Sequence, residues 1–403
     1  MDKWTLSQNC NTTLMFLLFF LVFVCGIIEM YQWTVVLRRR YFMSIEKDLK
    51  KDGIQVIKEV DTLSVTLIAK FVAERLSSTF LFYGLKYNDL FIKISRIPMY
   101  IATMPDGMAE ANYFYKNSSI YFREGLSIEE MQTYAVHEFI HHLQELKDKK
   151  NVLYRLGLCD FTNFKVYGMG LNEAAVQYLA SKALKNEVET VKYYGITFSS
   201  NSPNCYPLLC NLMSQIAYLV GEPLLVDSTF GSNDKLKAKL IYLLGERNFY
   251  TIQDNFDKIL YAEEKIVQYS NKVKDDSLSE KQIVKYAYGI GSSKKKITDT
   301  YIATQKLILS SYFEHYLENI RSVYEIETFR KQLYGYKDYI GTLQDDTFFN
   351  TFYIDAMAKL EEKEAELTGT TANLVPYKRN FFSILWQKCT ALWKGRQTEN
   401  EKI

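Results

Sequence analysis

A cluster of histidines is the part of this chain whose possible chemistry is easiest to define. The 403-residue sequence contains 4 histidines, and three of them lie together at positions 137, 141 and 142. His137 and His141 lie one turn apart on the same face if the segment is helical. Two imidazoles in this arrangement bind one metal ion together, and Glu138 is placed to act on a water rather than on the metal. HEFIH therefore predicts part of a hydrolytic metal site, with a solvated helix face as the alternative.

A catalytic zinc site needs a third protein ligand, and the residues after the histidine pair limit the choice. The metzincin pattern has glycine and histidine where this chain has Gln144 and Lys147. Glu173, in the segment GMGLNEAAVQYLASKAL, is the better candidate, because the alanines that follow it allow close approach between two helices. The alternative is that Glu173 binds no metal and is a first-turn carboxylate stabilised by the helix dipole. Asp160 and His315 are the alternative ligands.

HEFIHH followed by NEAAVQYLA resembles the gluzincin branch of zinc metallopeptidases, in which HExxH supplies two ligands and a Glu on a second helix the third. The order of strand, capped HExxH helix and NExx helix is similar to the minigluzincin-type catalytic core, over about residues 95–185. The resemblance implies zinc bound by His137, His141 and Glu173, and Glu138 as the catalytic base. Many gluzincins have an acidic residue four positions after the third ligand, where this chain has Gln177.

Local signals predict the elements that position these residues. Ser127 is suited to cap the histidine helix, and Glu130 completes a capping box with it. Residues 97–123 contain three short β-branched or aromatic runs separated by turn signals, which predict a small three-stranded sheet. Asn172 is a suitable cap for the helix of Glu173. Most of the later sequence has helical patterning. We therefore expect an α+β fold, predominantly α-helical, with a small sheet packed on the HExxH helix as in a zincin-like core.

The sequence leaves two features of substrate binding open. Enzymes of this kind add a His or Tyr donor for the developing oxyanion, and Tyr167, Tyr178 and His142 are candidates. The strand Ser119–Arg123 has two interpretations. It either presents an open edge on which an extended peptide pairs, or it is a core strand without a role in substrate binding.

The N-terminal segment predicts a membrane anchor in residues 1–40. Residues 14–28 are LMFLLFFLVFVCGII, and no charged residue occurs between Lys3 and Glu29. With the two preceding threonines, this span reaches the lower limit for crossing a bilayer, roughly 17 residues. A signal peptide is the alternative, but no small-x-small cleavage site follows. Because residues 38–40 are all arginine, the positive-inside rule predicts a single-pass protein of the cell membrane with a cytoplasmic catalytic domain.

Two further regions follow the anchor. We expect a zincin-like metallopeptidase domain over residues 41–265 and a helical C-terminal region over residues 266–403. Residues 381–393, with basic residues on both sides, form an amphipathic tail that either lies on an anionic leaflet or docks on the core. The net charge of +2 gives no indication of a nucleic-acid partner.

These features together predict a membrane-anchored zinc metalloprotease that acts on peptide or protein substrates, with Glu138 as general base. The alternative is a catalytically silent, zinc-stabilised, membrane-associated binding protein. The presence of Glu138 discriminates between them, because a structural zinc site does not need that carboxylate and prefers a fourth protein ligand.

Overall fold

A computed structural model of the chain describes residues 45–149, 153–162, 165–274, 278–341 and 347–369. Helices predominate in these residues and the strands are short, so this part of the chain is a mostly helical α+β protein, as the sequence predicts. The predicted anchor (residues 1–40) and the basic tail (residues 381–393) lie outside the described residues.

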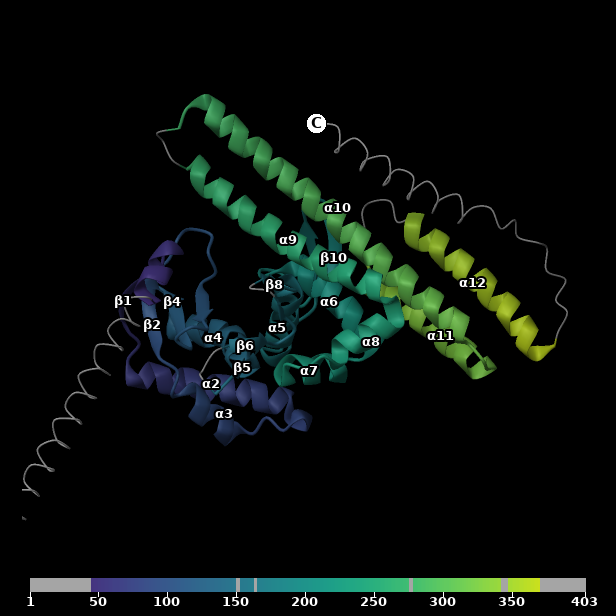
Figure 1. Cartoon of the computed structure of the whole chain (residues 1–403), viewed down its shortest axis with the longest axis horizontal. Coiled ribbons are helices and arrows are strands. Elements are labelled where there is room, and N and C mark those ends of the chain that lie inside the picture. The colour runs from purple at the N-terminus through teal and green to yellow at the C-terminus, as the bar shows by residue number, and fades with distance from the viewer. Residues whose placement is uncertain (1–44, 150–152, 163–164, 275–277, 342–346, 370–403) are drawn as a thin grey trace, which may run out of the picture.

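The main sheet lies near the N-terminal end of the described chain (Figure 1). Its strands are β1 (Gln55–Glu59), β2 (Met99–Thr103), β3 (Ala111–Phe114) and β4 (Ser119–Arg123). They lie in the order β1-β2-β4-β3, with β2 parallel to β4 and the other two pairs antiparallel. Three strands over residues 97–123 are therefore confirmed. The sequence did not predict β1, whose side chains are all exposed.

The expectation that Ser119–Arg123 presents an open edge is wrong, and the alternative, a core strand, is confirmed. β4 lies between β2 and β3, and four of its five residues are buried. A strand covered on both faces has a continuous apolar run, and Ile120 to Phe122 form such a run. β3 takes the edge position because the chain turns back after Phe114 and pairs antiparallel along β4.

Helices cover the sheet and share a core with it. They are α2 (Thr62–Thr79), α3 (Tyr87–Ile94) and α4 (Ile128–Gln144), with a 3-10 turn at Leu81–Tyr83. α2 contributes Val72 and Leu76 to this core, and α4 contributes Phe139 and Ile140, all of them fully buried. The expected packing of a small sheet against the HEFIH helix is thus present.

The rest of the described chain consists of three two-stranded hairpins and a series of helices. The hairpins are β5 (Glu145–Lys147) with β6 (Leu153–Leu156), β7 (Asp160–Thr162) with β8 (Lys165–Tyr167), and β9 (Glu189–Tyr193) with β10 (Ile196–Ser200). The helices are α5 (Met169–Ala183), α6 (Pro207–Val220), α7 (Glu222–Gly231), α8 (Lys235–Leu244), α9 (Glu246–Val273), α10 (Glu280–Asn319), α11 (Val323–Tyr336) and α12 (Thr347–Thr368), with a 3-10 turn at Lys337–Tyr339.

The long helices α9 and α10 lie side by side (Figure 1) and build the larger core together with α5, α6, α8 and α11. Residue 265, where the sequence suggests a domain boundary, lies inside α9. Apolar side chains from both sides of it, such as Phe256 and Tyr301, belong to this one core. The predicted division stays a prediction, and the backbone has no break at that position.

Among the described residues, no single helix is long and apolar enough to cross a membrane. The pair α6 and α7, bent by 114°, meets the length and composition criteria when the two helices are taken together. Most of α6 is buried in the larger core, which accounts for its apolar composition.

Candidate metal centre

The start of α4 is fixed by residues within its own sequence. The Ser127 hydroxyl accepts a hydrogen bond from the Glu130 N–H at 3.2 Å, and the Glu130 carboxylate accepts one from the Ser127 N–H at 2.8 Å. This is the predicted capping box. Ala135 and Phe139 then turn into the core, which leaves His137 and His141 on the face of α4 that looks towards α5.

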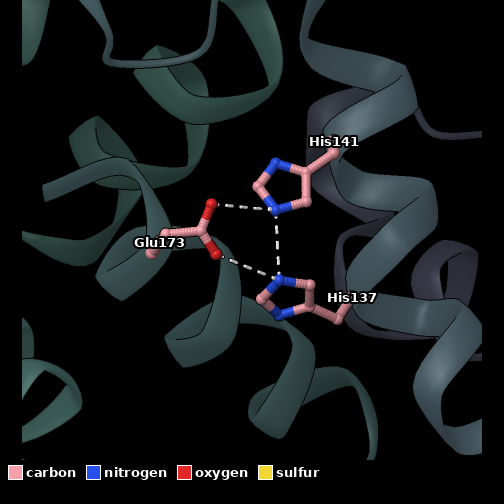
Figure 2. Close-up of side chains that lie close together, drawn as sticks. All are labelled: His137, His141 and Glu173. Atoms are coloured by element: carbon pink, nitrogen blue, oxygen red, sulfur yellow. Dashed lines mark hydrogen bonds and ion pairs between the residues drawn. The ribbon is translucent and has the colours of Figure 1, made fainter. Parts of the chain in front are cut away.

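Three side chains from two helices meet at this face, as Figure 2 shows. The Nε2 atoms of His137 and His141 are 3.1 Å apart. Each lies 3.4 Å from one carboxylate oxygen of Glu173. One ligand atom from each residue lies within 4.8 Å of the others, so the group could hold a metal ion. The structure therefore brings together the three residues that the sequence proposed as ligands.

The donor set and its hydrogen bonds fit such an ion. The Nδ1 atom of His137 lies 2.7 Å from the Gln177 amide oxygen. Because the Gln177 amide nitrogen donates to the Ser202 hydroxyl at 2.9 Å, its oxygen is the atom that faces His137. His137 must then donate from Nδ1, which leaves the Nε2 lone pair free for a metal. Gln177, four positions after Glu173, thus orients one of the three candidate ligands. The buried Nδ1 of His141 has no partner among the described residues.

Electrostatics at the three ligands also favour a cation. Burial lowers the pKa of His137, but the Glu173 hydrogen bond and the charges of Glu138 and Glu173 outweigh it and raise this pKa to about 9. Burial opposes ionisation of Glu173, yet the two imidazoles hold the pKa of that carboxyl well below its usual range. The group therefore stabilises positive charge between its members, and a divalent ion supplies such charge.

Glu173 is positioned by a segment far along the chain. α5 begins after Gly168, which has a φ of +80°. The Asp257 carboxylate on α9 accepts hydrogen bonds from the N–H groups of Gly168 and Gly170, at 2.9 and 2.7 Å. A Cβ on Gly170 would lie 2.4 Å from the backbone of Phe256, so only glycine allows α5 and α9 to approach this closely. No local pattern predicts this contact, because its two sides are far apart in the chain.

The predicted role of Asn172 as a helix cap is wrong. The helix begins earlier, with Gly168 at the cap position, and Asn172 lies buried inside it. Its amide instead exchanges two hydrogen bonds with Gln144 at the end of α4, at 3.1 and 3.2 Å. The cap moved because Asp257 satisfies the first N–H groups of α5. The Gln144–Asn172 pair joins the two helices that carry the ligands.

Glu138 lies beside the ligands but points to the sheet. Its carboxylate accepts a hydrogen bond from the backbone N–H of Tyr113 in the edge strand β3, at 2.7 Å, and its side chain is buried. The Tyr113 hydroxyl lies 2.9 Å from Nδ1 of His142. Two contacts thus fix β3 against α4. They were not predicted, because they join residues on separate elements.

The remaining candidates have other contacts. Asp160 pairs with Lys237 at 2.7 Å, and His315 packs edge-on against Tyr242. Neither belongs to the cluster of three ligands. Tyr178 donates to Glu222 at 3.1 Å.

Tyr167, a candidate oxyanion donor, is 44% exposed. Tyr206 was not proposed from the sequence. Burial raises its pKa well above the usual range, and the charge of Glu173 raises it further. It is a further candidate donor.

Comparisons with protein-family models, with curated proteins and with solved structures found no match for this chain. The residues and the geometry of the candidate metal centre are therefore the basis for inferring a function.

Proposed function

We propose that this protein is a zinc-dependent metallopeptidase of the gluzincin type. The observation that supports it is the convergence of His137, His141 and Glu173 from two helices, with a separate carboxylate, Glu138, held beside them. Two imidazoles and one carboxylate form the ligand set of a catalytic zinc site, which keeps one position open. A structural zinc site would have four protein ligands, and the cluster in the described residues contains three.

When bound, a zinc ion supplies a Lewis acid that polarises a carbonyl group and lowers the pKa of a water molecule to about 7. The protein supplies the proton transfer. The Tyr113 N–H donates a hydrogen bond to one oxygen of the Glu138 carboxylate, which fixes the orientation of the carboxylate plane. The other oxygen is left to take a proton from the attacking water and to pass it to the leaving amine.

The edge strand β3 is suited to bind an extended peptide. Glu110 accepts a backbone hydrogen bond from Arg123 at 2.8 Å. The alternation of an antiparallel ladder then turns the backbone groups of Ala111 and Tyr113 away from β4, towards the free edge. The Tyr113 N–H is used by Glu138, which leaves its carbonyl and both groups of Ala111 for a substrate strand. The substrate role that the sequence suggested for Ser119–Arg123 is therefore proposed for β3.

The membrane anchor and the cytoplasmic orientation also remain proposals. They depend on the apolar run at residues 14–28 and the arginines at 38–40. Tethering at this end would hold the catalytic unit close to the bilayer and to peptides presented there.

The test is to measure bound zinc and peptide cleavage for the purified full-length protein and its variants. Glu138→Gln should keep zinc and lose cleavage by at least about 100-fold, because a base is removed and the ligands are not. Glu173→Ala should lose most of the zinc, because a ligand is removed. Glu129→Gln, an exposed carboxylate in the first turn of the same helix, is the matched control and should behave as the parent. Cleavage by Glu138→Gln at the parent rate would show that the protein is not this kind of peptidase.

A further inference from the structure

A chain of three hydrogen bonds leads from His137 to the loop between β10 and α6. The Nδ1 atom of His137 lies 2.7 Å from the Gln177 amide oxygen, and the Gln177 amide nitrogen donates to the Ser202 hydroxyl at 2.9 Å. The Ser202 hydroxyl in turn donates to the backbone carbonyl of Cys205 at 2.5 Å. The metal centre therefore has a supporting element besides α4 and α5, namely the loop of residues 201–206.

The last member of this chain gives the chain a direction. A backbone carbonyl only accepts hydrogen bonds, so the Ser202 hydroxyl uses its one proton on Cys205 and must accept from Gln177. The Gln177 amide then presents its nitrogen to Ser202 and its oxygen to His137. The Cys210 thiol points to the same Cys205 carbonyl from 4.0 Å and is the weaker donor. The direction of the chain is thus fixed from the loop towards the metal centre.

Gln177 cannot select this orientation by itself. The end of an amide side chain has an oxygen and an NH2 group of similar size, and turning it over exchanges the two. In the turned orientation the NH2 group would face His137, and Nδ1 of that ring would have to accept. The ring proton would then stay on Nε2, which is the atom that a metal ion needs. The wrong orientation of Gln177 therefore competes directly with metal binding.

The second contact of the Gln177 amide does not decide between the two orientations. Its nitrogen also donates to the Ser181 hydroxyl, at 3.3 Å. That hydroxyl has no other hydrogen bond within the residues that the structure describes, so it can turn either to accept from the nitrogen or to donate to the oxygen. Ser202, whose proton is used by Cys205, is the contact that selects the orientation.

The loop that contains Ser202 is itself fixed in the larger core. The Ser202 N–H donates to the Ser200 hydroxyl at 3.0 Å, and both serines are at most 3% exposed. One residue earlier, the Ser199 carbonyl accepts a hydrogen bond from the Asn211 amide at 3.0 Å, and this amide also donates to the Tyr339 carbonyl at 2.9 Å. Ser202 is therefore held by contacts that do not involve the metal centre.

We infer that Ser202 is a positioning residue of the metal centre, which keeps Nε2 of His137 available to zinc through the orientation of the Gln177 amide. The inference deepens the proposed function, because it rests on the zinc site and adds an element outside the two helices that carry the ligands. It also predicts that Ser202 matters only while residue 177 is an amide. A carboxylate has two acceptor oxygens and no N–H group, so it accepts from His137 whichever way it turns.

The zinc affinity of full-length variants, measured by competition with a chelating indicator, tests this role. Ser202→Ala should bind zinc about 10-fold more weakly than the parent, because the Gln177 amide is then free to turn. In the Gln177→Glu background, the same Ser202→Ala change should alter zinc affinity by less than about threefold. Ser228→Ala is the matched control and should bind zinc as the parent does. Ser228 is a fully buried serine on α7, and its hydroxyl accepts from the Leu236 N–H at 2.9 Å.

The two backgrounds separate positioning from structural support. If Ser202→Ala lost the same zinc affinity with glutamine and with glutamate at position 177, Ser202 would only support its loop, and the inference would be overturned. Ser202→Ala with the zinc affinity of the parent would overturn it as well. Zinc binding with the expected dependence, but without cleavage of any peptide, would overturn the proposed peptidase and leave the role of Ser202 intact. A parent protein that binds no zinc would overturn both.

Nuclear magnetic resonance of the zinc-loaded full-length protein with isotope-labelled histidine gives a second measurement. The chain contains 4 histidines, and the signal of His137 is the one that should shift in Gln177→Glu. Its ring proton should lie on Nδ1, and in Ser202→Ala it should exchange with water about 5- to 10-fold faster, the equivalent of one lost hydrogen bond. A parent protein in which Nδ1 of His137 carries no proton would overturn the inference even if no variant folded.

Discussion

The two halves of the metal centre are built in different ways. On α4, three residues of the centre lie within five positions, and the helix begins with a capping box between residues three apart. On α5, Glu173 depends on hydrogen bonds from Gly168 and Gly170 to Asp257, across 89 and 87 residues. The first half is organised by local sequence, and the second by the tertiary structure. A substitution that disturbs the packing of α9 should therefore affect Glu173 while the α4 half stays formed.

The largest expected effect is at Gly170, where α5 and α9 touch. Gly170→Ala places a Cβ 2.4 Å from the Phe256 backbone, which cannot move without shifting α9. We expect a loss of about 3 kcal/mol in the free energy of unfolding, at the upper end for overpacking, and weaker zinc binding. Urea unfolding and zinc titration measure the two effects.

Gly291→Ala is the matched control, since that glycine is also helical but has open space around it. It should leave zinc binding unchanged and stabilise α10 by up to about 1 kcal/mol, because alanine is the better helix former. If Gly170→Ala were as stable as the parent and bound zinc equally, the dependence of Glu173 on α9 would be contradicted.

This difference also explains what could be predicted from the sequence. HEFIH, its capping box and the three strands over residues 97–123 are encoded by residues close together, and the structure has them. Glu173 could be proposed because the α4 half demands a third ligand. Asn172 was misassigned because the group that caps its helix is Asp257, which no local pattern links to it. The position of Ser119–Arg123 inside the sheet is set by strand order, which the spacing of strands does not determine.

A second expected effect concerns pH and involves α9, the helix that organises the α5 half. Burial of Glu263 raises its pKa to about 7, although a hydrogen bond with Tyr193 opposes the shift. The ordinary value is 4.5. The native state therefore binds more protons than the unfolded state between these values, and its stability falls as the pH rises through 7. We expect a loss of roughly 2 to 3 kcal/mol between pH 5 and 8 from this group.

Urea unfolding of the parent and of Glu263→Gln across this pH range isolates the effect. The amide does not titrate, so the difference in unfolding free energy between the two proteins should change in favour of Glu263→Gln as the pH rises. A difference that stays constant with pH would mean that Glu263 is as well solvated in the native state as in the unfolded chain.

The smallest expected effects come from substitutions at the two helix starts, Asp257 for α5 and Ser127 for α4, and they allow the two halves to be compared directly. Asp257→Ala leaves the buried N–H groups of Gly168 and Gly170 without their acceptor, which should lower the free energy of unfolding by about 2 kcal/mol. Because the first turn of α5 is then free to shift, zinc affinity should fall by about 10-fold or more. Ser127→Ala removes one cap hydrogen bond on α4 and should lower the free energy of unfolding by about 1 kcal/mol.

Zinc affinity separates the two variants more clearly than stability does. Ser127 lies at the exposed start of α4, ten residues before His137, and the packed core around Phe139 holds the rest of that helix. Ser127→Ala should therefore fray only the first turn of α4 and leave zinc binding within about twofold of the parent. Asp257 lies at the turn that leads directly into Glu173. If Ser127→Ala weakened zinc binding as much as Asp257→Ala, the two halves would depend on each other, and the distinction between a locally encoded half and a tertiary half would have to be abandoned.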